Sequence, residues 1–318
     1  MSTTNKFLFA VLTTSIQAGT CLIYATIGEI LAERSGILNL GVEGMMLVGA
    51  LTAFTVAFYT QNLLVAVILA MIAGGLMALI HALLSIKFRA DQNVSGLALT
   101  IFGTGLANFL GRYLGPNGSS LVGQVAPHLA KMPIPGLADL PFVGRIFFHH
   151  DILVYIMYML VAASWFYLYK TWPGLNLRAI GENPQAVDSL GINVFRLRYI
   201  YTAIGGMLAG LAGAHLSLAY SPGWSDNMTA GRGWIVIALT IFATWNPVRG
   251  LFGALLFGSL SILQFSIQTI GRRISGSILN MMPYILTIGV LVIITWWEGI
   301  RKSAGTPQAL GIPYSREE

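Results

Sequence analysis

The sequence predicts an all-α polytopic membrane protein with about nine transmembrane segments. The composition supports this fold class, because 55% of the residues are hydrophobic and only 9% are charged. A soluble domain carries about 25% charged residues. The mean hydropathy is +0.72. Apolar runs of about 20 residues, the length that an α-helix needs to cross a bilayer, recur along the chain.

The apolar segments follow one another with short links along most of the chain. They cover residues 7–30, 37–59, 63–86, 94–111, 152–169, 199–219, 233–247, 250–270 and 282–298. The two glycine-rich segments, 37–59 and 233–247, are expected to be broken or re-entrant, because glycine permits a discontinuous helix. No soluble domain interrupts the series, so residues 1–318 are predicted to form a single transmembrane domain.

The longest links indicate the orientation of the chain. Residues 112–151 are rich in proline and glycine, and residues 170–198 are rich in charge. Lys and Arg concentrate in the cytoplasmic loops of membrane proteins. Placing Arg301, Lys302 and Arg316 inside also puts 170–198 inside. If successive segments cross the membrane in alternate directions, this placement predicts a cytoplasmic C-terminus, an external N-terminus and an external loop at 112–151.

The stretch "LRAIGENPQAVDSLGINVFRLRY", residues 177–199, is a polar insert in an otherwise apolar chain. Asn183 can cap the free N–H groups of a helix, and Pro184 is well tolerated at the first helical position. Gly191 is a typical C-terminal stop. The pattern therefore predicts a short helix of about two turns.

One side of this short helix is apolar and carries Ala186, Val187 and Leu190. Two turns are too short to be stable alone in water, so the helix must dock on something. Two interpretations stay open at this point. The helix packs on lipid headgroups, or it is a coupling helix that inserts into a groove on a cytoplasmic motor.

Glu43 is interpreted as the only acid well inside an apolar segment. A carboxylate at that depth costs about 2.5–3.5 kcal/mol on insertion scales, so it should face a cavity or a partner. Asn39 precedes it by four residues and would share its side of a helix. A role in a solute pathway is one interpretation. In the other, Glu43 caps backbone N–H groups or pairs with Arg34.

Other candidate pathway residues carry an amide, a hydroxyl or an indole ring within apolar segments. They are Asn93, Ser95, Thr100, Asn108, Trp234 and Trp245. In one interpretation these side chains line a solute pathway, where they supply flat stacking surfaces and hydrogen-bonding groups. The alternative is that the polar groups bridge helices and that the tryptophans lie at the bilayer interface.

Several function classes lack their sequence signals. The chain has no Walker-type phosphate loop, no metal-ligand spacing and no nucleophile elbow. We therefore expect no catalytic residue, no bound metal and no cofactor. The net charge of +6 is assigned to cationic loops against the lipid bilayer, and no nucleic acid partner is expected.

Four stretches resemble one known family. "LRAIGENPQAVDSLGINV" resembles the cytoplasmic loop of ABC importer permeases of the ribose/nucleoside type. "GEILAERSGILNLGVEGMMLVGA", "NVSGLALTIFGTGLANFLG" and "GRGWIVIALTIFATWNPVRGLFGALLFG" are similar to the nucleoside-importer branch, in the same order and spacing. The resemblance spans about residues 20–298. The short amino terminus resembles the smaller permease of a pair.

The resemblance implies a permease that imports nucleosides or a related small polar solute by alternating access. It implies an ABC ATPase that uses ATP and Mg, a second permease copy or paralogue, and an extracytoplasmic solute-binding lipoprotein. It places the chain in the bacterial inner membrane. It assigns the 170–198 loop, with Arg178 and Glu182 beside the short helix, to contact with the ATPase.

Two alternatives remain at the level of the sequence. A sugar permease of the ribose type shares the family's architecture. A stand-alone secondary transporter or channel usually carries several intramembrane carboxylates or basic groups, and Glu43 alone fits that class poorly. A membrane-embedded enzyme is disfavoured by the missing nucleophile and metal sets.

Overall fold

The computed structural model describes residues 3–269 and 305–316, together with residues 281, 282, 285, 288, 289 and 292. Within these residues every regular element is helical, as predicted. Seven helices are long and apolar enough to cross a membrane. The predicted segment 282–298 lies mostly outside the described residues.

The long helices match seven predicted segments. They are α1 (Thr3–Arg34), α2 (Val42–Thr60), α3 (Leu63–Ala82) with its extension η1 (Leu83–Lys87), α4 (Gln92–Tyr113), α6 (Ile152–Lys170), α9 (Val194–His215) with its extension η3 (Leu216–Tyr220), and α11 (Pro247–Thr269). Capping residues fix several boundaries. Asp91 accepts a hydrogen bond from Val94 N at 2.9 Å at the start of α4, and Asp151 does the same for Leu153 N at 3.0 Å in α6.

The two glycine-rich segments differ from the others. The segment 233–247 forms α10 (Arg232–Phe242), which has 11 residues. At about 1.5 Å per residue this helix is about 16 Å long, roughly half of what a bilayer requires. The segment 37–59 is helical only from Val42, because residues 37–39 have no regular structure and residues 40–41 form a turn. Both segments are therefore discontinuous.

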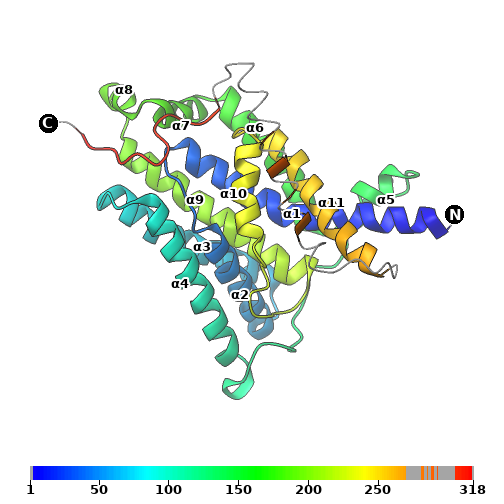
Figure 1. Cartoon of the computed structure of the whole chain (residues 1–318). Helices are drawn as coiled ribbons and strands as arrows, with labels where there is room; N and C mark the ends of the chain where they lie inside the picture. Colours follow the sequence, from blue (N-terminus) through cyan, green and yellow to red (C-terminus); the bar gives the residue numbers. More distant parts are fainter. Residues whose placement is uncertain are drawn as a thin grey trace.

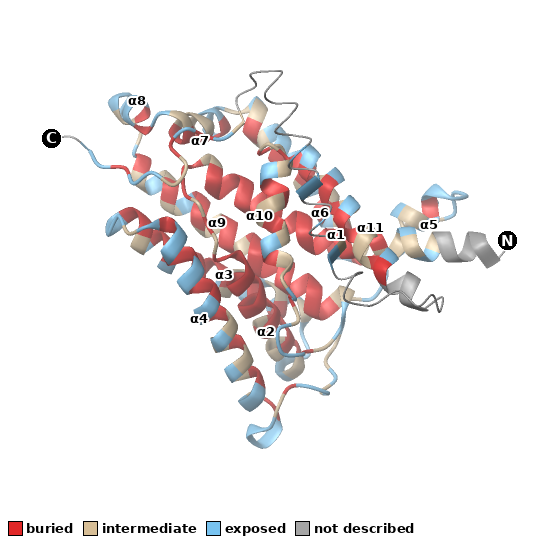
Figure 2. Ribbon diagram, viewed as in Figure 1, coloured by how far each residue is buried: buried red, intermediate tan, exposed pale blue. Residues whose placement is uncertain are grey.

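Helix α9 lies at the centre of the bundle, with α1, α2 and α3 around it (Figures 1 and 2). Glycine allows these backbones to approach closely. A Cβ on Gly210 would lie 2.2 Å from Ala70 O, and one on Gly49 would lie 2.5 Å from Gly210 Cα. Helices in a bilayer associate through such close packing, because lipid tails give no hydrophobic drive between apolar helices.

The outer surface is apolar where lipid would meet it. Helices α3 and α4 expose large aliphatic and aromatic side chains, including Leu64 at 70% and Ile101 at 74% exposure. Exposed positions recur along the outer side of α4 in Figure 2. The centre, by contrast, is closely packed. An apolar outer surface around a closely packed centre is expected of a helix bundle in a membrane.

The two ends of the bundle differ. One end carries α7 (Trp172–Glu182), α8 (Pro184–Ser189) and the C-terminal segment 305–316, and we call it the α8 end (Figure 1). At the opposite end, residues 114–151 run over the helix ends with only η2 (Pro116–Gly118) and α5 (Val143–Phe147) as regular structure. Leu129 N donates to Leu218 O at 2.8 Å, which attaches this loop to η3.

Candidate functional site

The polar insert folds as its sequence indicates at both ends. Asn183 Oδ1 accepts a hydrogen bond from Ala186 N at 3.0 Å, and Pro184 begins α8. Gly191 follows the helix with a φ of +79°, a left-handed conformation that favours glycine. The predicted start and stop of the short helix are confirmed, although α8 has only six residues.

The prediction that Ala186, Val187 and Leu190 form one free apolar side of α8 is wrong for Val187. Val187 is buried against Ile180, Val194 and Tyr314 of the same chain. Ala186 is exposed, and Leu190 is 78% exposed just after the helix. The C-terminal segment occupies the side of α8 that carries Val187, which the sequence around α8 alone does not indicate. The free apolar surface is therefore made by Ala186 and Leu190.

The charged residues before α8 face their own chain. Glu182 pairs with Arg34 at 3.8 Å and accepts a hydrogen bond from Gln308 N at 3.4 Å. The Arg178 guanidinium lies 5.2 Å from the centre of the Tyr169 ring. These contacts attach α7 to α1, α6 and the C-terminal segment.

Glu43 lies in the first turn of α2 and is 9% exposed. Its carboxylate accepts hydrogen bonds from Thr229 Oγ1 at 2.6 Å, from Gly231 N at 2.9 Å and from Gly233 N at 2.6 Å. The last two donors are free N–H groups at the start of α10, where a helix also carries partial positive charge. Glu43 thus caps α10 from another helix. The proposed pairing with Arg34 is wrong, because Arg34 pairs with Glu182.

Asn39 does not share a helix with Glu43, because α2 begins after it. Its backbone N and its Nδ2 donate to Glu29 at 3.2 and 3.3 Å, and its Oδ1 accepts from Gly41 N at 3.1 Å. Asn39 is 1% exposed. Its side chain therefore anchors the non-helical segment before α2 to α1.

Two acids in α1 were missed by the sequence reasoning. Glu29 and Glu33 are each 1% exposed, so Glu43 is not the only buried acid. Glu33 accepts a hydrogen bond from Trp245 Nε1 at 2.5 Å. The first predicted segment ended at residue 30, which placed Glu33 in a loop. Glu29 and Glu33 are four residues apart and so lie on one helix face, and this spacing could have indicated both acids from the sequence.

Helix α4 supplies polar contacts to the segment before α2. Thr100 Oγ1 donates to Leu40 O at 2.8 Å. Ser95 lies 3.0 Å from Nδ1 of the buried His81, whose Nε2 lies 2.9 Å from Leu38 O. Asn93 is exposed. Since irregular backbone in an apolar bundle needs partners for its polar groups, Thr100 and Ser95 have a local structural role.

The loop 221–231 runs along α4 on its way to α10. Arg112 pairs with Asp226 at 3.0 Å near the opposite end of the bundle. One turn earlier in α4, Asn108 exchanges two hydrogen bonds with Asn227, at 2.8 and 3.0 Å. The loop then reaches Glu43, so an irregular, polar stretch of backbone extends into the bundle.

The two tryptophans of the seventh segment have different surroundings. Trp245 is 3% exposed and bonded to Glu33, whereas Trp234 is 40% exposed in the first turn of α10. The structure therefore joins Glu43 to the start of α10, the helix whose first turn carries Trp234, and joins Asn108 to the loop that leads there. Trp245 and Asn39 lie in packing contacts. The described residues contain no group of three His, Cys, Asp or Glu side chains that could hold a metal.

The sequence matches a family of transport proteins over almost all of its length. Residues 10–295 match the family described as "Branched-chain amino acid transport system / permease component". The chain belongs to this permease family. No solved structure matches the permease in the comparison made with known structures.

Three curated proteins are similar to the permease from end to end. TsgC13 of Haloferax volcanii, a provisionally assigned glucose ABC transporter permease, is 41% identical over 98% of this chain and 99% of its own. The guanosine ABC transporter permease NupQ of Bacillus subtilis is 37% identical over 92% of both chains. The nucleoside ABC transporter permease NupC of Lactococcus lactis is 34% identical over 94% of both chains.

These similarities establish the class of the protein. The chain is the membrane-embedded permease subunit of an ABC transporter, and the resemblance to ribose/nucleoside-type permeases is confirmed. The family implies ATPase and solute-binding partners. A stand-alone secondary transporter is not favoured.

Proposed function

We propose that the permease forms the import pathway for nucleosides between the opposite end of the bundle and the α8 end, with the α8 end in the cytoplasm. The observation that carries the proposal is the discontinuous α10, whose start lies inside the bundle on Glu43 and is reached by the polar loop along α4. Irregular backbone at membrane depth is tolerated where protein buries it or where it lines a water-filled cavity.

The groups beside this loop suit a nucleoside. Asn108 and Asn227 carry amides that can hydrogen-bond a base or a ribose, and both are accessible enough to exchange their mutual bond for one to a solute. Trp234 presents a flat, partly exposed ring on the first turn of α10. In this scheme the scaffold beside the pathway is held by Asn39, Ser95, Thr100 and Trp245, and the exposed Asn93 has no assigned role.

The relatives support two solute classes. NupQ and NupC are named for guanosine and nucleosides, whereas TsgC13 is named for glucose. Glucose or another sugar is therefore the second candidate. Uptake of labelled guanosine and labelled glucose, each with a hundredfold excess of the other unlabelled, separates them. Saturable glucose uptake that guanosine does not reduce would overturn the nucleoside assignment and leave the pathway in place.

The proposal assigns energy coupling to α8. Its free surface, Ala186 and Leu190, is small, apolar and exposed, which suits insertion into a groove of an ATPase. Hydrolysis of ATP with Mg would belong to that partner, with no cofactor bound by this chain. A second permease and an extracytoplasmic binding protein would complete the importer.

Replacing Ala186 with Asp tests the coupling assignment. A carboxylate buried without a partner costs about 3 kcal/mol, which corresponds to a loss of more than about 100-fold in affinity. We expect Ala186→Asp to insert normally and to lose its ATPase during purification. Ala130→Asp, the same change at an exposed site of the 114–151 loop, is the matched control and should retain it. Retention by both variants would refute coupling through α8.

A further inference from the structure

The C-terminal segment 305–316 lies across the α8 end, far in sequence from the helices that it contacts (Figure 1). Its backbone bonds to two of them. Ala309 N donates to Gly181 O at the end of α7 at 2.8 Å, and Gly311 N donates to Gly36 O in the turn after α1 at 3.2 Å. Both partners are glycines with no room for a side chain, since a Cβ would lie 2.3 Å from Arg34 O at Gly181 and 2.6 Å from Arg198 Nη2 at Gly36.

The end of the segment holds α8 itself. The Arg316 guanidinium donates from Nε and Nη2 to the two oxygens of Asp188, at 2.7 and 2.8 Å. Tyr314 donates its hydroxyl hydrogen to Asp188 at 3.0 Å, and its ring packs on Val187. Such a two-bond fork between Arg and a carboxylate fixes direction as well as distance.

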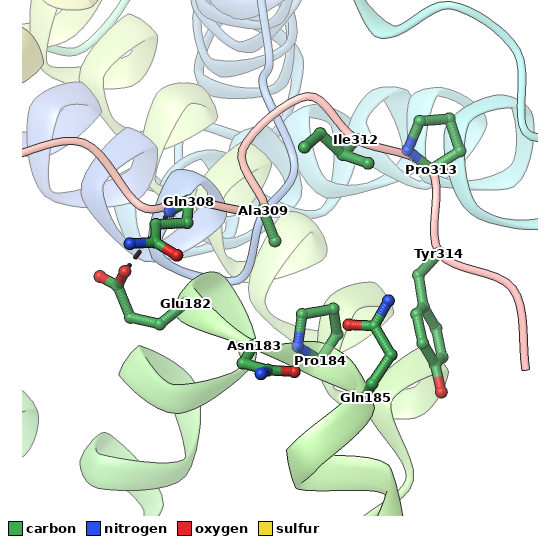
Figure 3. A pocket seen from close by; sticks show the side chains of 9 residues that line it. All are labelled: Glu182, Asn183, Pro184, Gln185, Gln308, Ala309, Ile312, Pro313 and Tyr314. Atoms are coloured by element: carbon green, nitrogen blue, oxygen red, sulfur yellow. Dashed lines mark hydrogen bonds between the residues drawn. The ribbon is translucent and has the colours of Figure 1, made fainter.

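A groove of about 240 Å³ separates the two attachments. Figure 3 shows α8 and its preceding residues on one side and the C-terminal segment on the other. Glu182 and Gln308 meet at one end of the groove, and Tyr314 lies at the other. Because the groove leaves the middle of the segment away from α8, the hold on α8 is concentrated in Asp188, Tyr314 and Arg316.

Arg198, at the start of α9, connects the segment to the bundle. It is 1% exposed, donates from Nε to Ser35 O at 3.0 Å and from Nη1 to Ile312 O at 3.4 Å, and lies 5.9 Å from the Tyr314 ring centre. The turn at Ser35 and Gly36 leads directly to the non-helical segment 37–41. Contacts therefore run without a break from α8 to the start of α2, where Glu43 holds α10.

We propose that the C-terminal segment fixes the orientation of α8 and joins α8 to the turn at Ser35–Gly36, with Asp188, Tyr314 and Arg316 as positioning residues. The inference rests on the proposed role of α8 in coupling. A six-residue helix cannot hold its own conformation, so its direction depends on what it packs against. A displacement of α8 by the ATPase is then passed to the segment before α2 through the C-terminal segment.

The contact is ionic under ordinary assay conditions. Hydrogen bonds from Arg316, and to a smaller extent from Tyr314, hold the pKa of the Asp188 carboxyl below its ordinary value. A carboxyl with a lowered pKa loses its charge only at a pH below the ordinary range for Asp. The pair therefore persists at neutral pH and does not need a special buffer.

The test uses the full permease with its partner subunits and compares wild type with the double variant Tyr314→Phe, Arg316→Ala. We expect amide hydrogen exchange over residues 184–191 of the purified chain to become at least about fivefold faster, with other helices unchanged. We expect the ATPase to stay bound, and the ratio of guanosine or glucose uptake to ATP hydrolysis in proteoliposomes to fall at least about threefold. Lys87→Ala, which removes an exposed basic residue at the same end but outside the 170–198 loop, is the control.

Two further variants keep the test decisive. Tyr314→Phe with Arg316→Lys retains the charge but not the two-bond fork, so it should restore only part of the uptake ratio. If the double variant does not accumulate, Asp188→Asn removes the charge that Arg316 contacts and should give the same faster exchange. Unchanged exchange over 184–191, or an uptake ratio equal to that of Lys87→Ala, overturns the inference. Failure of the coupling role itself is recognised separately, because Ala186→Asp would then keep its ATPase.

Discussion

The carboxylate of Glu43 shows how one residue can organise a broken helix. Helix α10 has no side-chain cap of its own, because Gly231 occupies the N-cap position. Gly231 is partly buried and Gly233 is buried, and a buried N–H group without a partner costs free energy. Glu43 satisfies the N–H groups of both glycines and accepts a third bond from Thr229. The cost of burying the acid is thereby offset by three bonds and by the helix dipole.

Replacing Glu43 with Gln should destabilise the permease. A glutamine has one oxygen, so its NH₂ group would face either Gly231 N–H or Gly233 N–H, and one donor would lose its partner at a cost of about 1–3 kcal/mol. Thermal unfolding in detergent measures this loss. Arg34→Gln in the same background should add independently, within about 0.5 kcal/mol, because the two side chains share no contact. Coupling well above that value would contradict the capping role.

The two tryptophans at the ends of α10 give opposite expectations. Trp245→Phe leaves the buried Glu33 without its indole donor, and we expect a loss of about 1–3 kcal/mol in stability. Trp234→Phe changes a partly exposed ring and should alter stability by no more than about 0.5 kcal/mol. If Trp234 stacks on the solute, Trp234→Ala weakens uptake affinity while the melting temperature stays unchanged. A large loss of stability in Trp234→Phe would contradict its placement.

At the scale of the elements, glycine contacts decide how closely α2, α3 and α9 can pack. Gly210 contacts both neighbours, since a Cβ there would meet Ala70 O in α3, and a Cβ on Gly49 in α2 would meet Gly210 itself. These backbone atoms cannot move aside independently, in contrast to the end of a flexible side chain. The centre of the bundle therefore has little tolerance for added volume.

Gly210→Ala and Gly105→Ala form a matched pair of single-methyl additions. Gly210→Ala should cost about 1–3 kcal/mol or more, because the helices must separate. Gly105 lies within α4, and a methyl group added there would have nothing within 4 Å, so Gly105→Ala should stabilise by about 0.5–1 kcal/mol through helix propensity. Melting temperatures of the two variants check the prediction. Equal shifts would show that the α3–α9 contact is looser than described.

Local sequence signals were sufficient for most elements and for the ends of α8. Apolar length located seven helices, and Asn183, Pro184 and Gly191 located the short helix. Contacts between distant parts of the chain could not be predicted from local sequence signals. The burial of Val187 depends on Tyr314, and the role of Glu43 depends on the loop that returns at Thr229. No local pattern encodes either pairing.

The same limit explains the errors at the start of α2. A helical spacing was assumed for Asn39 and Glu43, although the chain at Asn39 is not helical and its side chain bonds to Glu29. Glycine richness did indicate a discontinuity there, and the structure has one. The position of the break required the partners from α1 and α4, which only the folded chain supplies.

At the scale of the whole molecule, the two ends have different constructions. The α8 end joins α7, α8, α9 and the C-terminal segment through ion pairs and backbone bonds. The opposite end is covered by the long loop 114–151, and the loop 221–231 enters the bundle from that side. A transporter that receives solute on one side and a motor on the other requires such an asymmetry.

Single-cysteine labelling would determine on which side of the membrane each end lies. The only native cysteine, Cys21, is fully buried, so the wild-type chain serves as the unlabelled background. A membrane-impermeant maleimide applied to intact cells should label Ala130→Cys and Ser225→Cys, which are exposed at the opposite end. Ser189→Cys and Ser315→Cys, exposed at the α8 end, should react only after permeabilisation. Bound ATPase should then protect Ser189→Cys, which lies in α8, because docking on Ala186 and Leu190 covers that surface. Labelling of the α8-end cysteines in intact cells would reverse the proposed direction and exclude α8 as the contact with a cytoplasmic motor.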